Sequence, residues 1–86
     1  MILNMTTQEF SRLTTRELKQ IFSEYLGSKV NEIQWGSMTN EKWGEYKIRH
    51  DVYAHSLIKV EPSKIGLTKL SIYNYIKKEW QDMPSC

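Results

Sequence analysis

The sequence is poor in the residues that mark several specialised classes of small protein. Its 86 residues include one cysteine, two prolines and four scattered glycines. Because Cys86 has no second cysteine to pair with, an internally disulfide-bonded scaffold is excluded, and we expect a reducing, cytoplasmic location. The glycines form no phosphate-binding loop, so we expect no nucleotide cofactor.

Long apolar runs and charge of a single sign are also lacking. The apolar runs extend over a few residues, far short of the roughly 20 that cross a bilayer, so we expect no membrane partner. Residues 1–5 lack both the basic start and the apolar core of a secretory signal. The formal net charge is +2, which by itself indicates neither a nucleic-acid nor a membrane partner.

What the chain does contain is enough for one small folded unit. Hydrophobic residues make up 40% of it, including two Phe, three Trp and five Tyr. A chain of this length has room for one modest core and no deep substrate cleft. We therefore expect a single domain over residues 1–86, with residues 1–5 and 84–86 as mobile tails.

Residue sets that carry catalysis or bind metals are scarce. His50 and His55 are close in sequence, but Cys86 is distant, and a structural zinc site usually needs four ligands in recognisable pairs. We expect His50 to be half-buried and hydrogen-bonded. Ser56 follows His55 directly, and neighbouring strand residues point to opposite faces, so they do not suit a nucleophile and its base. We expect a non-enzymatic protein without a metal or cofactor.

Two capping boxes predict the N-terminal helices. In Thr14-Thr15-Arg16-Glu17, the Thr14 side chain can accept from the Glu17 N–H while Glu17 reaches back to Thr14. This motif predicts a helix over about residues 15–26, with Gly27 as its left-handed cap. The similar motif at residues 6–9 predicts a short helix over about residues 7–12. The expected apolar face of the longer helix consists of Leu18, Ile21, Phe22 and Tyr25.

The middle of the chain alternates as strands do. Apolar residues take every second position in two segments separated by polar turn residues, which predicts a hairpin with one solvated face. A third, shorter run ends at Pro62, because proline cannot donate to a ladder. The alternating positions are Ile33 and Trp35, then Tyr46, Ile48, His50 and Val52, and the third run contains Leu57, Ile58 and Val60.

The C-terminal segment has an apolar spacing typical of a helix. Ile72, Ile76, Trp80 and Met83 fall on one stripe at 100° per residue. The predicted fold is therefore α+β: an N-terminal helix with a possible short helix before it, a three-stranded antiparallel sheet, and a C-terminal amphipathic helix packed on the sheet.

Residues 62–76 within this segment also resemble the second half of a helix-turn-helix. Gly66 would be the turn glycine, Leu67 the plug between the helices and Ile72 the inward anchor of the recognition helix. In that motif, residues near the start of the second helix reach the bases. The alternative is a packing helix whose lysines only solvate its exposed face.

Nucleic acid is the first partner that the sequence suggests. Five lysines against one acid occur between residues 59 and 78, with tyrosines interleaved, and polar positions of the hairpin add two further cations. Cations that bind phosphates together with aromatics that stack on bases would account for this pattern. The candidate nucleic-acid-binding residues are Lys69, Tyr73, Asn74, Lys77, Lys78, Lys47 and Arg49.

A protein partner is the alternative. Alternation points Trp43, at the mouth of the expected hairpin, away from the core, with Met38 and Tyr53 nearby in sequence. Exposed aromatics of this kind anchor protein interfaces, including those of homodimers. The sequence thus predicts a small regulatory binding protein that binds nucleic acid through its basic C-terminal helix. The alternative is a protein-binding module or inhibitor that occupies the surface of a larger protein.

Overall fold

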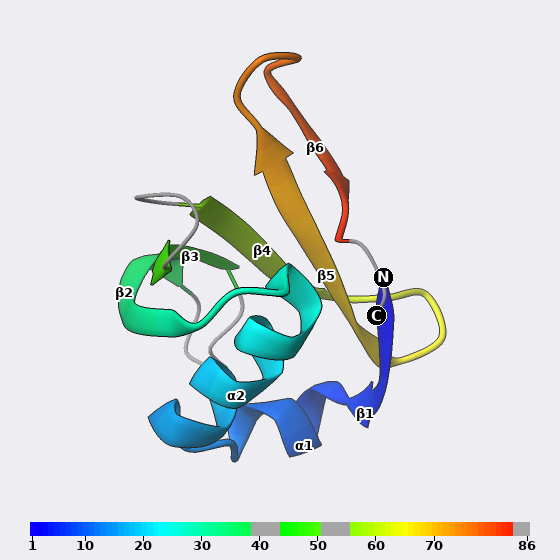
Figure 1. Ribbon diagram of the computed structural model, residues 1–86. Helices are drawn as coiled ribbons and strands as arrows, with labels where there is room; N and C mark the ends of the chain where they lie inside the picture. The colour runs from blue at the N-terminus through cyan, green and yellow to red at the C-terminus, as the bar shows by residue number, and fades with distance from the viewer. Residues whose placement is uncertain (39–43, 51–55, 84–86) are drawn as a thin grey trace.

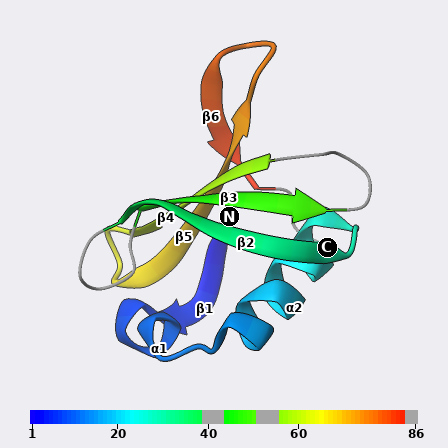
Figure 2. The ribbon, with the colours of Figure 1, turned by 90° about the vertical axis from the view of Figure 1, so that its left-hand side faces the viewer.

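The fold is a strongly curved antiparallel sheet with two helices on one side of it (Figures 1 and 2). We describe residues 1–38, 44–50 and 56–83 of a computed structural model. In these ranges the elements are β1 (Ile2–Thr6), α1 (Thr7–Ser11), α2 (Thr15–Leu26), β2 (Val30–Met38), β3 (Gly44–His50), β4 (Ser56–Pro62), β5 (Leu67–Asn74) and β6 (Glu79–Asp82).

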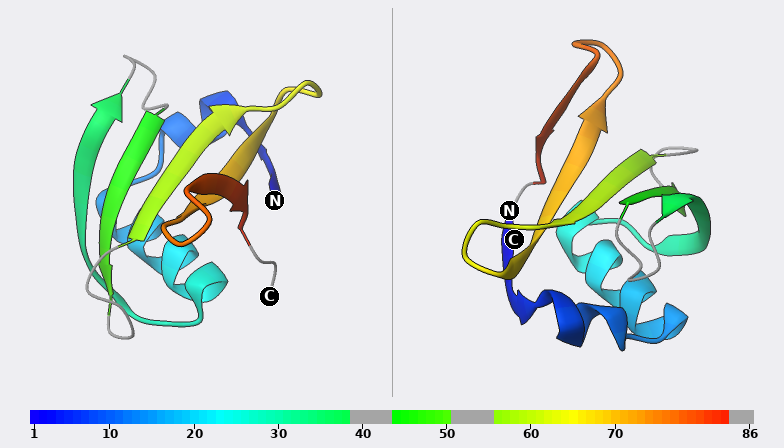
Figure 3. Two further views of the ribbon diagram at one scale, coloured as in Figure 1. Left: turned by 90° about the horizontal axis from the view of Figure 1, so that it is seen from above. Right: turned by 180° about the vertical axis from the view of Figure 1, so that it is seen from behind.

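The described strands form one six-stranded sheet in which every registered pair is antiparallel. The order is β1-β5-β4-β3-β2, and β6 also pairs with β5. β4 covers one edge of β5, while β1 and β6 share its other edge, with β1 along the first half and β6 along the second. Strands from opposite ends of the sequence therefore meet on β5 (Figure 3).

Both predicted helix starts are confirmed. Thr14 accepts from the Glu17 N–H at 3.2 Å, and its own N–H donates to Glu17 Oε1 at 3.0 Å. These hydrogen bonds hold the pKa of the Glu17 carboxyl below its ordinary value. Thr6 and Glu9 form the equivalent box ahead of α1. α2 ends at Gly27, whose φ of 67° is the left-handed conformation that glycine adopts without strain.

The core lies between α2, α1 and the concave face of the sheet. Phe22 and Tyr46 are fully buried and meet edge to face, with ring centroids 5.8 Å apart. Burial raises the pKa of the Tyr46 phenol far above its ordinary value. Among the residues whose burial is described, the buried apolar side chains are Leu3, Phe10, Leu18, Phe22, Val30, Tyr46, Ile48, Ile58, Val60, Leu70 and Met83.

The predicted fold is wrong in its C-terminal third. Residues 67–82 are not a helix packed on a three-stranded sheet but two further strands, β5 and β6, joined by a turn. Gly66, which would be the turn glycine of a helix-turn-helix, instead takes a φ of 82° in the tight β4–β5 turn. The Ser63 N–H donates to the Leu67 carbonyl across this turn at 2.8 Å. The resemblance to a helix-turn-helix is therefore not structural.

Both local residue preferences and long-range hydrogen bonding favour strand β5 over a helix. Residues 68–76 are rich in β-branched and aromatic side chains, which suit a pleated surface. Alternate residues Thr68 and Leu70 point inward and are fully buried. As a strand, the segment also supplies hydrogen-bond partners to β1 and β4, which a helix cannot do.

The remaining strand predictions are confirmed where the structure describes them. β2 and β3 pair as the expected hairpin, with Ile33 opposite Ile48, and β4 ends at Pro62. Val52 lies outside the described residues. No helix in the described ranges is long and apolar enough to cross a membrane.

Thr68 provides a test of the inward face of β5. Its side chain is fully buried, and its hydroxyl has no hydrogen-bond partner among the described residues. A buried hydroxyl without a partner costs about 1–3 kcal/mol, so Thr68→Val should raise the free energy of unfolding by about 1 kcal/mol. Denaturant titration measures this change, and Thr15→Val, on the exposed first turn of α2, should stay within about 0.5 kcal/mol of the wild type. Destabilisation by Thr68→Val would contradict the inward placement.

Candidate functional site

The β5–β6 hairpin extends away from the body of the protein (Figure 1). The last registered pair between β4 and β5 is Ile58 with Ile72, whereas β6 continues to pair as far as Asn74 with Glu79. The outer end of the hairpin thus has two strands. A two-stranded hairpin is at best marginally stable in water, so side-chain contacts must stabilise it.

An aromatic cluster on one face of the hairpin supplies such contacts. Tyr73 stands directly opposite Trp80, and their rings meet edge to face with centroids 5.2 Å apart. Tyr75 makes a similar contact with Tyr73 at 5.1 Å. Lys59 of the neighbouring β4 places its Nζ 4.5 Å from the centre of the Trp80 ring, a cation–π contact. The cluster therefore ties the hairpin to the sheet.

Asn74 fixes the conformation of the turn. Its Oδ1 accepts from the N–H groups of Ile76 and Lys77 at 3.0 and 2.9 Å, and its Nδ2 donates to Gln81 Oε1 at 3.1 Å. Lys78 takes a φ of 55°, a left-handed conformation that is uncommon for residues other than glycine. With its amide engaged in this way, Asn74 shapes the hairpin.

The tip of the hairpin exposes apolar side chains to water. Ile76 is 94% exposed and Tyr75 is 55% exposed, although both are large and apolar. Lys77 and Lys78 follow directly and are exposed as well. The tip therefore combines an apolar point with two adjacent cations, on a turn that Asn74 holds in one conformation.

Four of the seven residues predicted to bind nucleic acid come together on this hairpin: Tyr73, Asn74, Lys77 and Lys78. The other three lie elsewhere on the outer face of the sheet, which is the face opposite α2. Lys69 stands across from Glu61, and Arg49 across from Glu32. Lys47, on β3, stands between Gln34 and Leu57. The outer face therefore carries both signs of charge.

The residues predicted for a protein interface are described only in part. Met38 is the last residue of β2, and its backbone pairs with Gly44. Trp43 and Tyr53 lie outside the described residues. The helical spacing of Ile76 and Trp80 predicts core positions for both, whereas Ile76 is exposed at the hairpin tip and Trp80 is half-buried on the hairpin. The signal for a hairpin was Asn74 followed by four turn residues between two short runs rich in β-formers.

His50 forms a buried polar bridge apart from the hairpin. It is 5% exposed, and its ring nitrogens lie 3.2 Å from Ser28 Oγ and 2.9 Å from Ser56 Oγ. The expected hydrogen-bonded histidine is confirmed, and it is more deeply buried than predicted. The bridge connects the end of α2 to β3 and β4. Within the described ranges, no group of three or more His, Cys, Asp or Glu side chains is placed to hold a metal.

Comparisons of the chain with protein-family models, with curated proteins and with solved structures find no match.

The Trp80→Ala variant tests whether Trp80 belongs to the aromatic cluster of the hairpin or to the hydrophobic core. Because Trp80 is half-buried and contacts Tyr73 and Lys59, its loss should cost about 1–2 kcal/mol, and the loss should be concentrated in the hairpin. Phe22→Ala, which empties a fully buried site, should cost about 3–5 kcal/mol. Denaturant titration measures the loss in the free energy of unfolding, and amide hydrogen exchange shows which part of the structure is destabilised. Equal costs for the two variants would place Trp80 in the core.

Proposed function

We propose that the protein is a non-enzymatic binding protein whose β5–β6 hairpin inserts into an apolar pocket of a larger partner protein. The observation that carries this proposal is the 94% exposure of Ile76 at the tip of a projecting hairpin. Burying an exposed isoleucine side chain is favourable by about 1.5–3 kcal/mol. The free protein leaves Ile76 in water, whereas a pocket on a partner would bury it.

The hairpin is organised before it binds. The Asn74 hydrogen bonds fix the turn, and the ring contacts of Tyr73 fix its base. Order that exists in the free protein does not have to be created on binding, so more of the contact energy appears as affinity. A few anchor residues carry most of the binding energy of a protein interface.

The charge of the tip specifies the partner further. Lys77 and Lys78 lie beside Ile76 and would face the rim of the partner's pocket. Carboxylates on that rim would speed association and favour the correct partner, because charges at an interface rim act mainly on rate and specificity. We therefore propose a partner whose apolar pocket is bordered by Asp or Glu.

Nucleic acid, the first partner expected from the sequence, has weaker support. That hypothesis placed the C-terminal lysines along one helix, whereas they lie on strand β5 and in the hairpin turn. In addition, Lys69 and Arg49 stand opposite carboxylates on the sheet. The tyrosines and lysines of the hairpin retain it as the second candidate, since stacking and phosphate contacts use the same residue types.

Site-specific crosslinking tests the proposal. A photoreactive amino acid replaces Ile76, and the control carries it at Gln20, an exposed residue of α2. In cells of the source organism, position 76 should crosslink to one protein, at an apolar site next to acidic residues, and position 20 should not. Crosslinking to nucleic acid from position 76, or equal protein crosslinking from both positions, would contradict the proposal.

Affinity for the crosslinked protein then provides the quantitative test. Ile76→Ser should weaken binding at least about tenfold, as expected for an anchor residue, while leaving thermal stability unchanged because the side chain is exposed. Gln20→Ser should leave both unchanged. A salt titration with random oligonucleotides should show no binding tighter than about 100 μM, the range at which non-specific nucleic-acid binders usually register.

A further inference from the structure

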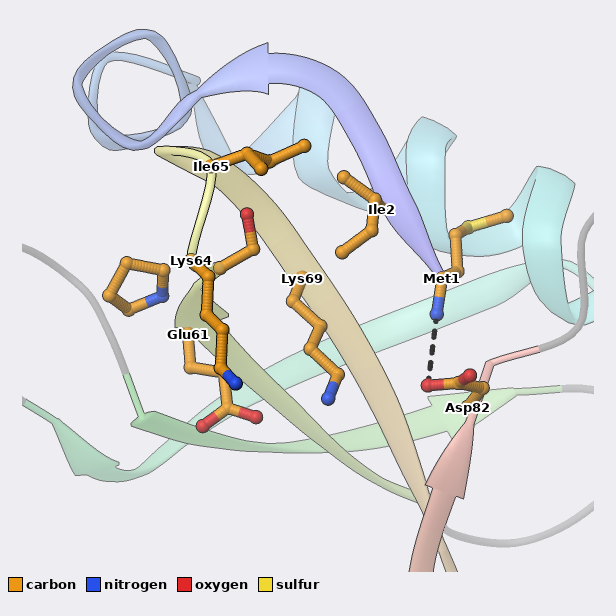
Figure 4. Close-up of a pocket in the computed structure, with 9 residues that line it drawn as sticks. Met1, Ile2, Glu61, Lys64, Ile65, Lys69 and Asp82 are labelled. Atoms are coloured by element: carbon orange, nitrogen blue, oxygen red, sulfur yellow. Dashed lines mark ion pairs between the residues drawn. The ribbon is translucent and has the colours of Figure 1, made fainter.

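A pocket of about 620 Å³ opens on the outer face of the sheet, at the end of β5 away from the hairpin tip (Figure 4). Its volume falls within the range of about 300–1,000 Å³ that is usual for ligand sites. β1, the end of β4, the β4–β5 turn, β5 and the end of β6 contribute to it. The lining includes the apolar Ile2 and Ile65 and the charged Glu61, Lys64, Lys69 and Asp82.

The apolar part of the pocket is exposed to water. Ile65, in the β4–β5 turn, is 73% exposed, and Ile2 is 44% exposed. Figure 4 shows both side chains at one end of the pocket. Among the described residues, Ile2, Ile65, Tyr75 and Ile76 are the exposed large hydrophobics, so this pocket and the hairpin tip contain all four.

The polar part of the pocket has an excess of positive charge. Asp82 is already paired with the Met1 amino group, with Oδ1 and N 3.3 Å apart. Glu61 stands opposite Lys69 in the strand register, and Lys64 adds a second cation from the turn. In Figure 4 the charged ends of Glu61, Lys64 and Lys69 lie on the same side of the pocket. Two lysines against one carboxylate leave one cation to bind an anion.

The pocket and the aromatic cluster of the hairpin lie on the same face of the sheet. Residues opposite one another in an antiparallel pair share a face, as do alternate residues along a strand. Ile2 is paired with Lys69, and Tyr73 with Trp80. Lys69 and Tyr73 are four residues apart on β5, a separation of roughly 13 Å along a strand. A peptide segment of four or five residues spans that distance.

We infer that this pocket is a second binding site, for an aliphatic side chain next to a carboxylate. Ile2 and Ile65 cover the aliphatic group, while Lys64, the cation left over beside the opposed Glu61 and Lys69, binds the carboxylate. Such a ligand occurs at the C-terminus of a peptide and wherever Asp or Glu is next to Leu, Ile or Val. Binding of one partner by both this site and the hairpin would depend on the proposed function. The chemistry of the pocket is independent of that function.

N-acetyl-leucine is the probe that tests the site, because it joins one aliphatic side chain to one carboxylate. Added to ¹⁵N-labelled protein, it should shift the amide signals of residues 63–65 and 69 in a saturable way, with a Kd on the order of 1–10 mM for a ligand this small. N-acetyl-leucinamide, which has the same side chain and no charge, should bind at least about fivefold more weakly.

Variants of two exposed residues then locate the site. Lys64→Ala should remove the preference for the carboxylate, and Ile65→Ser should weaken both probes; neither residue is buried, so both variants should fold. Ile76→Ser, on the hairpin, should leave the titration unchanged, so failure of the proposed function would not change this result. Equal binding of acid and amide, or no saturation of the shifts by N-acetyl-leucine, would overturn the inference.

Discussion

The fold depends on one strand edge that two distant segments must share. β5 has β4 along one side, and its other side is divided between β1 and β6. The division falls at Leu70, whose N–H donates to the Met1 carbonyl at 2.8 Å and whose carbonyl accepts from Met1 N at 3.1 Å and from the Met83 N–H at 3.4 Å. The Leu70 side chain is fully buried below this junction. Backbone pairing and core packing thus coincide at one residue.

The arrangement has a direct consequence for the surface. Because β1 occupies the first half of the edge, β6 pairs along the second half, and the turn that joins it to β5 must lie beyond the last pair with β4. The hairpin therefore projects, and its tip exposes Tyr75 and Ile76. At the other end of β5, the β4–β5 turn brings Ile65 beside β1 and borders the pocket. Both proposed contact sites follow from how β5 is paired.

The structural features predicted correctly from the sequence are those determined by residues close together in the chain. A capping box is formed by residues three apart, so Thr14 and Glu17 locate the start of α2 without knowledge of the rest of the fold. Alternation in β3 is similarly local, since Tyr46, Ile48 and His50 all point inward. His50 was predicted to be hydrogen-bonded for the same reason, although its partners Ser28 and Ser56 become neighbours only in the fold.

The C-terminal error has equally specific causes. The spacing of Ile72, Ile76 and Trp80 satisfies a helical period by coincidence, since in the structure Ile76 is a turn residue and Trp80 belongs to another strand. The left-handed turn position is taken by Lys78, so the usual glycine signal is missing. The requirement that decides between helix and strand, an unpaired β4 edge, is not local and cannot be found in a short window. The apolar anchor of the candidate site was missed for the same reason, because the helical spacing predicts a core position for Ile76, which is 94% exposed.

A nuclear Overhauser spectrum of the isotopically labelled protein tests the central claim most directly. If β5 organises the fold, backbone protons of residues 71–74 should show cross-strand effects to residues 79–82, and Leu70 should show them to Met1. A continuous series of sequential amide–amide effects from residue 67 to residue 80, without cross-strand effects, would indicate a helix and contradict the account.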